Sequence, residues 1–297
     1  MSNKPRKMTL EKKHNLTGWA FLAPATFLIA VFSFWPMIKA LVLSFQTGKG
    51  RNMQMAGFTN YIRMFQDDVF IQSIKNTFFY FILQVPIMLV VALVLACILN
   101  KKDLRFKGFF RTMIFVPCTT SLVAYSIIFR SLFANDGLVN YVLVNLGILD
   151  KPYNFLTQPF AAKMVIILAL LWRWTGYNMV FFLSGLQNIE YSVYEAAKID
   201  GASAIQTFFK ITVPLLKPTI LLTAIMSTNG TLQLFDESVN LTDGGPANAS
   251  ISMSHYIYNL CFKYVPNFGY AAAMSFFILL LVAVLAFIQM RVGDKRD

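Results

Sequence analysis

Charged side chains are scarce in this chain of 297 residues. Asp, Glu, Lys and Arg together make up 13% of the sequence, and only 14 residues are acidic. A soluble globular domain carries about 25% charged residues, because its surface faces water. Hydrophobic residues instead reach 57%, and 29 residues are Phe. The composition therefore excludes an ordinary soluble domain and favours a membrane protein.

Recognisable sites for chemistry are also missing. The three cysteines, Cys97, Cys118 and Cys261, are scattered and odd in number, which argues against a disulfide framework or a zinc site. The sequence holds no G-x-x-x-x-G-K-[ST] loop for phosphate and no plausible Ser-His-Asp set or pair of catalytic carboxylates. The net charge of +12 does not indicate nucleic acid, because the basic residues lie between long apolar runs. We therefore expect no enzymatic activity, no cofactor or metal on this chain, and no nucleic-acid partner.

Long apolar runs dominate what is present. About 20 helical residues cross the hydrocarbon core of a bilayer. We therefore expect an all-α membrane protein with about six transmembrane helices. The predicted spans lie near Trp19–Phe45, Ile74–Leu99, Thr112–Phe133, Pro159–Leu186, Pro218–Phe235 and Phe268–Met290. Kinks are expected at Pro36, Pro86 and Pro117.

The distribution of Lys and Arg predicts the orientation. With a cytoplasmic N-terminus, sixteen of these residues fall in inside segments and five in outside loops, which is a clear positive-inside bias. Both termini are therefore expected in the cytoplasm. The predicted organisation is a cytoplasmic segment over residues 1–18, one transmembrane domain over 19–290 and a cytoplasmic tail over 291–297. The first span is expected to be retained, because its apolar run is too long for a signal peptide.

The most informative segment is the inside loop at about residues 188–214. Residues 190–198 are good helix formers, and Gly201 is typical of a turn or helix C-cap because glycine adopts positive φ cheaply. Ser203 can cap a second short helix, and Pro214 is expected to stop it. The loop therefore predicts a helix-turn-helix at the cytoplasmic surface. Its second helix carries apolar residues that need lipid or a partner protein to pack against, namely Ile205, Phe208 and Phe209.

The spacing in this loop resembles the EAA loop of permease subunits of binding-protein-dependent ABC importers. That pattern reads E-A-A, three residues, G, nine residues, I, one residue, then L-P. The residues that carry the resemblance or lie within it are Glu195, Ala196, Ala197, Asp200, Gly201, Ala202, Ile211 and Pro214. Val213 stands where Leu is usual and keeps the apolar character. Without the pattern, Glu195 would be a solvated helix face and Gly201 a routine turn.

Further segments resemble the carbohydrate branch of the same family, which includes maltose and multiple-sugar permeases. They are Ala23-Pro24, Gly57-Phe58-Thr59-Asn60-Tyr61, Leu186-Gln187-Asn188-Ile189, Asp200-Gly201-Ala202, Leu241-Thr242-Asp243-Gly244-Gly245-Pro246 and Gly269-Tyr270-Ala271-Ala272. The resemblance thus covers nearly the whole chain. It implies the ABC importer permease fold and a multi-pass location in the bacterial plasma membrane.

The resemblance also implies a mechanism and a set of partners. An extracellular binding protein would deliver a sugar or oligosaccharide to a path formed by this chain and a second homologous permease, as a heterodimer. Two ATP-binding subunits would bind ATP and Mg beneath them. The EAA loop would dock on an ATP-binding subunit as a coupling helix and transmit its closure to the spans, which requires a two-state lever.

Polar side chains inside the predicted spans are candidates for the solute path, because lipid-facing positions would be costly. They are Trp172, Arg173, Tyr177, Asn178, Asn229, Gln233, Asp236 and Glu237. The last four recur near i, i+4, i+7 and i+8, so we expect them on one helix face. That stripe suits a hydroxyl-rich solute, or else acts as glue between helices. Arg173 either donates into the path or bonds an internal carboxylate or backbone carbonyls.

Three alternatives remain open. A permease for another solute class, such as phosphate, an amino acid or a metal, would share the loop but usually not the segment at residues 241–246. A self-contained secondary transporter would show an internal repeat and more spans. A membrane scaffold or membrane enzyme would need neither the polar face nor the loop.

Overall fold

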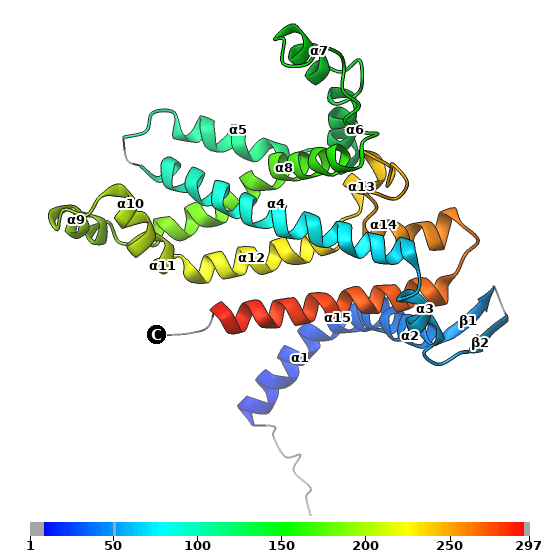
Figure 1. Ribbon diagram of the computed structural model, residues 1–297. Helices are drawn as coiled ribbons and strands as arrows, with labels where there is room; N and C mark the ends of the chain where they lie inside the picture. The colour runs from blue at the N-terminus through cyan, green and yellow to red at the C-terminus, as the bar shows by residue number, and fades with distance from the viewer. Residues whose placement is uncertain (1–8, 50–51, 102, 294–297) are drawn as a thin grey trace, which may run out of the picture.

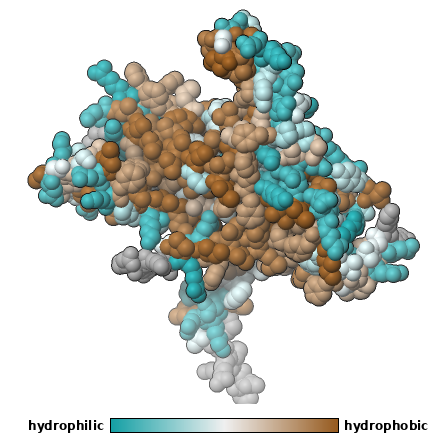
Figure 2. All heavy atoms as spheres, viewed as in Figure 1, coloured by the Kyte–Doolittle hydropathy of each residue, from teal (hydrophilic) through white to brown (hydrophobic). Residues whose placement is uncertain are grey.

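The computed structural model describes residues 9–49, 52–101 and 103–293. Its long helices form an elongated bundle and run along a broadly common direction (Figure 1). They are α4 (Asp68–Asn100), α8 (Pro159–Gln187), α12 (Lys217–Leu232) and α15 (Phe268–Gly293). Apolar residues spread across the middle of the bundle, and hydrophilic residues gather towards its two ends (Figure 2). Such a banded surface fits a bundle that crosses a bilayer.

The loop end carries residues 188–216, and the hairpin end carries residues 46–67 (Figure 1). Among the described residues, four helical runs are long and apolar enough to cross a membrane, and six if each of two bent helix pairs counts as one span. The predicted all-α membrane fold is thus confirmed.

The first helical run begins away from the bundle and ends against α15 (Figure 1). It comprises α1 (Leu10–Ile29), the π-helical segment η1 (Ala30–Phe34) and α2 (Trp35–Ser44). The run begins at Leu10 rather than near Trp19, and none of its most apolar window is buried against the rest of the chain. Pro36 lies just after the π-helical segment, in the first turn of α2, where its missing N–H is tolerated. Residues 1–8 and 294–297 of the predicted terminal segments lie outside the described residues.

The predicted third span is not one helix, which corrects the expectation for Thr112–Phe133. It consists of α5 (Lys107–Thr119) and α6 (Leu122–Leu132), which meet at 98°. Pro117 lies in the last turn of α5, and Thr120 is extended at ψ 153°. Ser121 then caps α6 with its side chain. By contrast, α4 continues through Pro86 without a break.

The predicted inside loop is largely helical at the loop end of the bundle. Its elements are α9 (Tyr191–Ile199), α10 (Ala204–Thr207), the π-helical segment η2 (Phe208–Thr212) and α11 (Val213–Leu215). Pro214 does not stop the second helix, contrary to expectation, because it lies in the first turn after the π-helical segment, where a missing N–H costs little. The break comes instead at Leu216, and the chain turns by 71° into α12.

The hairpin end is built from short elements. They are β1 (Gln46–Lys49), β2 (Asn52–Met55), α3 (Thr59–Met64), α14 (Met253–Tyr258) and the π-helical segment η3 (Asn259–Lys263). Helix α13 (Asp236–Asn240) packs on α6, and α7 (Leu138–Asn145) follows α6 at the top of Figure 1, away from the β-hairpin. The two strands are antiparallel, with Gln46 opposite Met55. Helix α3 begins two residues after Gly57. Asn60, in α3, donates hydrogen bonds to the carbonyls of Ser44 and Gln46 and ties α2 to the hairpin.

One carboxylate joins three helices at this end. Asp67 caps α4 by accepting from the N–H groups of Val69 and Phe70, and it accepts from the hydroxyls of Tyr256 and Tyr270 at 2.7 and 2.8 Å. Burial opposes its ionisation, but these four hydrogen bonds outweigh burial and hold the pKa of Asp67 below its ordinary value. The charged form of Asp67 therefore stabilises the junction of α4, α14 and α15.

Three clusters of buried apolar side chains follow one another along the bundle. One at the hairpin end centres on Phe70 and Tyr270, a middle one on Tyr80 and Ile166, and one at the loop end on Phe182. In α8, Gly176 permits close contact with α5, because a Cβ there would collide with the carbonyl of Ile114. This packing fixes α8 as the central helix against which the candidate site is built.

Candidate functional site

Local sequence signals shape the α9–α10 hairpin. Helix α9 ends at Ile199 with Asp200 as its C-cap, and Gly201 has φ +75°, where a Cβ would be strained. The N–H of Ala202 reaches back to the carbonyl of Ala197 at 2.9 Å. Ser203 and Gln206 then form a reciprocal capping box at the start of α10. The predicted helix-turn-helix and the predicted Ser203 cap are therefore confirmed.

The α9–α10 hairpin contacts the bundle through few side chains, and its outer face is exposed. Ala197 is buried, and Phe208 packs against the loop-end cluster. The hydroxyls of Tyr194 and Thr212 lie 3.4 Å apart and connect α9 with η2. The residues of the EAA-like pattern that are exposed are Glu195, Ala196, Asp200, Gly201 and Pro214, whereas Ala202 and Ile211 are half-buried. The apolar side chains on the second helix include Ile205 and Phe209, which are 72% and 65% exposed.

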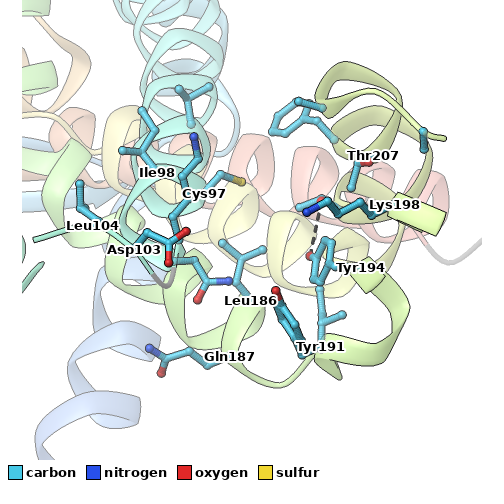
Figure 3. Close-up of a pocket in the computed structure, with 18 residues that line it drawn as sticks. Cys97, Ile98, Asp103, Leu104, Leu186, Gln187, Tyr191, Tyr194, Lys198 and Thr207 are labelled. Atoms are coloured by element: carbon cyan, nitrogen blue, oxygen red, sulfur yellow. Dashed lines mark hydrogen bonds between the residues drawn. The ribbon is translucent and has the colours of Figure 1, made fainter. Parts of the chain in front are cut away.

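A cavity of about 1120 Å³ separates this hairpin from the ends of α4 and α8. Figure 3 shows Tyr191, Tyr194 and Lys198 on the side of the α9–α10 hairpin. They face Cys97 and Ile98 on α4 across the open space. A hairpin that is braced internally but separated from the bundle by a cavity can move as a unit. The sequence did not predict this cavity.

A second cavity, of about 330 Å³, lies between α4, α8, α12 and α13. We call it the central cavity. Its size falls within the range of about 300–1,000 Å³ that is typical of small-molecule sites. Its polar lining residues are Gln84, Tyr177, Asn178, Ser227, Thr231, Gln233, Asp236 and Glu237, and its large apolar ones include Met88, Trp174, Met226 and Phe235. The mixture of amides, hydroxyls, carboxylates and rings can hydrogen-bond and stack on a sugar.

Hydrogen bonds between helices hold several of these groups in place. Thr231 donates to Gln84 at 2.9 Å and joins α12 to α4. Ser227 donates to the amide oxygen of Asn178 at 3.3 Å, while the Asn178 amide nitrogen bonds the carbonyl of Trp174. The sequence could have pointed to Gln84, because it is an amide in the middle of the apolar second span.

Five of the eight predicted path residues line the central cavity: Tyr177, Asn178, Gln233, Asp236 and Glu237. The predicted placement of Asn229, Gln233, Asp236 and Glu237 on one helix face is wrong, because α12 ends at Leu232 and α13 begins at Asp236. The backbone leaves the helix there, and Ser252 satisfies the freed carbonyl of Leu234 at 2.5 Å. Gln233 and Asp236 thus reach the cavity from an irregular segment.

The other three predicted path residues lie elsewhere. Trp172 stacks on Tyr125, with ring centroids 6.2 Å apart, and Asn229 is exposed on α12. Arg173 is 5% exposed and donates to the carbonyls of Pro117 and Thr120 at 3.3 and 2.7 Å. Of the two roles considered for Arg173, its contacts match bonding to backbone carbonyls, at the break between α5 and α6.

Glu237 connects the central cavity to that break. It is 3% exposed and accepts a hydrogen bond from the hydroxyl of Tyr125. The guanidinium of Arg173 lies over the ring of the same Tyr125, 4.9 Å from its centre. Arg173, Tyr125 and Glu237 therefore link α8, α6 and α13 through one buried polar network.

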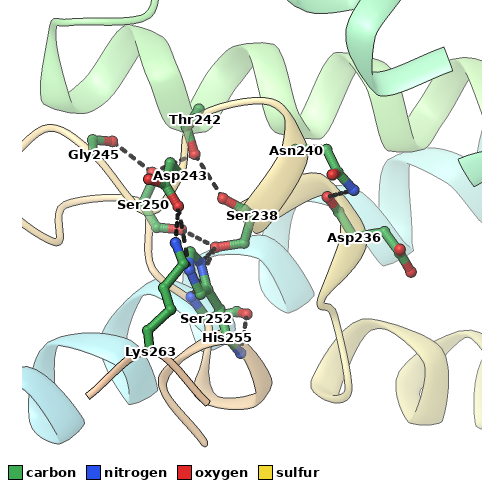
Figure 4. Close-up of polar contacts among 10 residues, drawn as sticks. All are labelled: Asp236, Ser238, Asn240, Thr242, Asp243, Gly245, Ser250, Ser252, His255 and Lys263. Carbon is green, nitrogen blue, oxygen red and sulfur yellow. Dashed lines mark hydrogen bonds and ion pairs between the residues drawn. The ribbon is translucent and has the colours of Figure 1, made fainter. Parts of the chain in front are cut away.

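A cluster of hydroxyl groups orders the segment at residues 238–255 (Figure 4). Ser238 and Ser250 lie at its centre, and Thr242 bonds Ser250 at 2.8 Å. His255 is fully buried, and its Nδ1 lies 2.9 Å from the hydroxyl of Ser238. Burial lowers the pKa of His255 to about 4, although the nearby Asp243 carboxylate opposes the shift. The imidazole is therefore neutral at pH 7.

Asp243 is the exposed acidic residue at the edge of this cluster. Lys263 donates to its carboxylate at 2.7 Å, and this bond raises the pKa of Lys263. Within the part of the chain that the structure describes, no three His, Cys, Asp or Glu side chains lie close enough to hold a metal ion.

Comparisons with known proteins give a consistent result. A family model described as "Binding-protein-dependent transport system inner membrane component" matches residues 68–296. The lactose transport system permease protein of Rhizobium radiobacter is 51% identical over 292 residues, which cover 98% of each chain. The multiple sugar-binding transport system permease protein of Streptococcus mutans is 33% identical and covers 97% of this chain and 99% of its own.

A solved structure has the same fold. It is a bacterial ABC transporter involved in the import of the acidic polysaccharide alginate, and one of its chains aligns with a TM-score of 0.85. That alignment covers 97% of this chain and 98% of the other, at 23% sequence identity.

Proposed function

The chain belongs to the family of binding-protein-dependent transport system inner membrane components, and from that membership we propose that it is the permease subunit of an importer for a sugar or oligosaccharide. As an inner-membrane component of an ABC transporter, it forms part of the translocation path, and a separate ATP-binding subunit hydrolyses ATP. The sugar class is supported by the lactose and multiple-sugar permeases, which match this chain over nearly its whole length.

The α9–α10 hairpin is the docking element for an ATP-binding subunit in this proposal. The observation that carries it is the exposed Gly201 turn, which presents Glu195 and the apolar residues Ile205 and Phe209 at the loop end with nothing covering them. Exposed apolar side chains of this kind mark a surface for a partner or lipid. The cavity behind the hairpin and the Tyr194–Thr212 contact make it a braced unit that can transmit motion.

The central cavity is this chain's share of the solute path. Its hydroxyls, amides and carboxylates offer hydrogen bonds to sugar hydroxyls, and Trp174, Tyr177 and Phe235 offer ring faces for stacking. Hydrogen bonds between helices hold Gln84 and Asn178 in fixed positions, which favours specific recognition.

The two ends of the bundle indicate where the remaining partners bind. The loop end carries Lys101, Lys107, Lys198, Lys210 and Arg291 and faces the cytoplasm, in keeping with the positive-inside rule. Two ATP-binding subunits with ATP and Mg dock there. The hairpin end receives the binding protein. A second, homologous permease completes the path and covers the exposed apolar side chains of α1 and of the outer face of α2.

Copurification tests this proposal. The tagged chain is extracted from its native membrane in mild detergent, as wild type and as Gly201→Asp. Gly147→Asp is the matched control. Gly147 also has positive φ and open space around it, but it lies after α7, far along the chain from the α9–α10 hairpin. We expect the wild type and Gly147→Asp to bring down an ATP-binding protein and a second permease, and Gly201→Asp to lose the ATP-binding protein. A wild-type chain that purifies alone would refute the proposal.

A further inference from the structure

The central cavity has charge of only one sign. Of its lining residues, Asp236 and Glu237 are acidic, and none is Lys, Arg or His. Its other polar groups are neutral amides and hydroxyls. A solute that enters this space leaves most of its water behind, so the sign of a nearby fixed charge weighs more than it would in bulk water.

The two carboxylates differ in what they are bonded to. Glu237 is buried in the wall and already accepts from Tyr125. Asp236 is half-buried, and the ion pairs found among the described residues do not include it. Its backbone carbonyl accepts from Asn240 at 2.9 Å, which fixes the turn of α13. The backbone of Asp236 is therefore held in place, and its carboxylate has no ion-pair partner among the described residues.

The neighbouring charges do not cancel this carboxylate. Figure 4 shows Asp236 and Asn240 apart from the serine cluster, whose cation Lys263 is bonded to Asp243. The buried cation Arg173 does not line the cavity, since it donates to the carbonyls of Pro117 and Thr120. Because the lining holds two carboxyl groups and no basic side chain, we expect a negative potential where α12 ends.

We propose that Asp236 is a specificity-determining residue that makes the central cavity reject anionic sugars and accept neutral or cationic ones. The proposal rests on the proposed sugar permease function and narrows it. It also separates this chain from the transporter of similar fold that imports the acidic polysaccharide alginate. Rejection by like charge is an effective route to specificity, because an unpaired anion in a desolvated site has nothing to offset the repulsion.

The test measures equilibrium binding to the purified importer complex without its binding protein, so that only the permease selects. Three probes share one scaffold: lactose, lactose oxidised at C6 of its galactose to the uronic acid, and the analogue with an amine at C2 of its glucose. Dissociation constants are followed by the fluorescence of Trp174, which lines the cavity, and checked by saturation-transfer NMR. The variants are Asp236→Asn and Asp236→Lys. Asp243→Asn is the matched control, because Asp243 is acidic and nearby but lies outside the lining.

For the wild type and Asp243→Asn we expect the uronic acid to bind at least about tenfold more weakly than lactose, and the amine at least as well as lactose. Asp236→Asn should bring the three constants within about threefold of one another, and Asp236→Lys should reverse their order. An unchanged order in both variants, with lactose still bound, would overturn the role of Asp236 and leave the permease function standing. Failure of every probe to bind the wild type would instead count against the sugar itself.

Discussion

Arg173 is expected to hold together the broken span formed by α5 and α6. Its guanidinium lies at the break and donates to the Thr120 carbonyl at 2.7 Å, the Thr120 hydroxyl at 3.1 Å and the Pro117 carbonyl at 3.3 Å. Thr120 is extended, so its carbonyl has left the helical ladder. Replacing Arg173 by Met keeps an unbranched apolar stem and removes every donor.

The expected loss can be estimated from these contacts. A buried carbonyl without a donor costs about 1–3 kcal/mol. The Pro117 carbonyl also accepts from the N–H and hydroxyl of Thr120, so only the Thr120 carbonyl is left unsatisfied. The cation–π contacts with Tyr125 and Trp174 add about 0.5–2 kcal/mol. Removing a buried charge offsets part of this sum, because the guanidinium no longer needs to be desolvated. We therefore expect Arg173→Met to lose about 2 kcal/mol.

The assay is the free energy of unfolding in mixed micelles titrated with SDS. Arg130→Met is the matched control, since Arg130 lies in the last turn of α6 and is exposed, and it should change the free energy by less than about 0.5 kcal/mol. Arg173→Lys should fall between Met and wild type, because an ammonium keeps the charge but not the planar fork. Equal stability of Arg173→Met and Arg130→Met would refute this account of the break.

Two further predictions concern packing and pH. Gly176→Ala should destabilise the chain by about 1–3 kcal/mol in the same assay, because the new Cβ meets the Ile114 carbonyl, although alanine favours helix. Gly230→Ala, which meets nothing within 4 Å, should be neutral or stabilising. His255 has a lowered folded pKa, so the folded state takes up its proton less readily than the unfolded state. Its contribution is complete above pH 6.5 and should fall by about 2 kcal/mol by pH 5, in unfolding measured across that range. His255→Gln should remove this component of the pH dependence; an unaltered slope would contradict the assignment.

Signals that act over a few residues suffice to predict part of the fold. The α9–α10 hairpin depends on the positive φ of Gly201 and on the capping box of Ser203, both of which are local. The long apolar runs likewise predict both ends of α8 and α15, and the C-terminal end of α4, to within a few residues. Helix α4 begins earlier than predicted, at Asp68 and not at Ile74. Such features need no knowledge of the rest of the chain.

The breaks in the spans could not be read in the same way. A helix can end inside the membrane only where its freed backbone groups find partners. Arg173 supplies that partner to Thr120 from 53 residues away, and Ser252 supplies it to Leu234 from 18 residues away. Helical periodicity gives no sign of either contact. It therefore places Gln233 and Asp236 on one helix face, although α12 ends before them.

The central claim is tested most directly by uptake of a radiolabelled sugar, beginning with lactose, into proteoliposomes that contain the complete importer, with ATP inside and the binding protein outside. We predict that the sugar accumulates only when ATP and the binding protein are both present, and that Gly201→Asp abolishes the accumulation while Gly147→Asp retains it. Accumulation by this chain alone, driven by an ion gradient without ATP, would contradict the account.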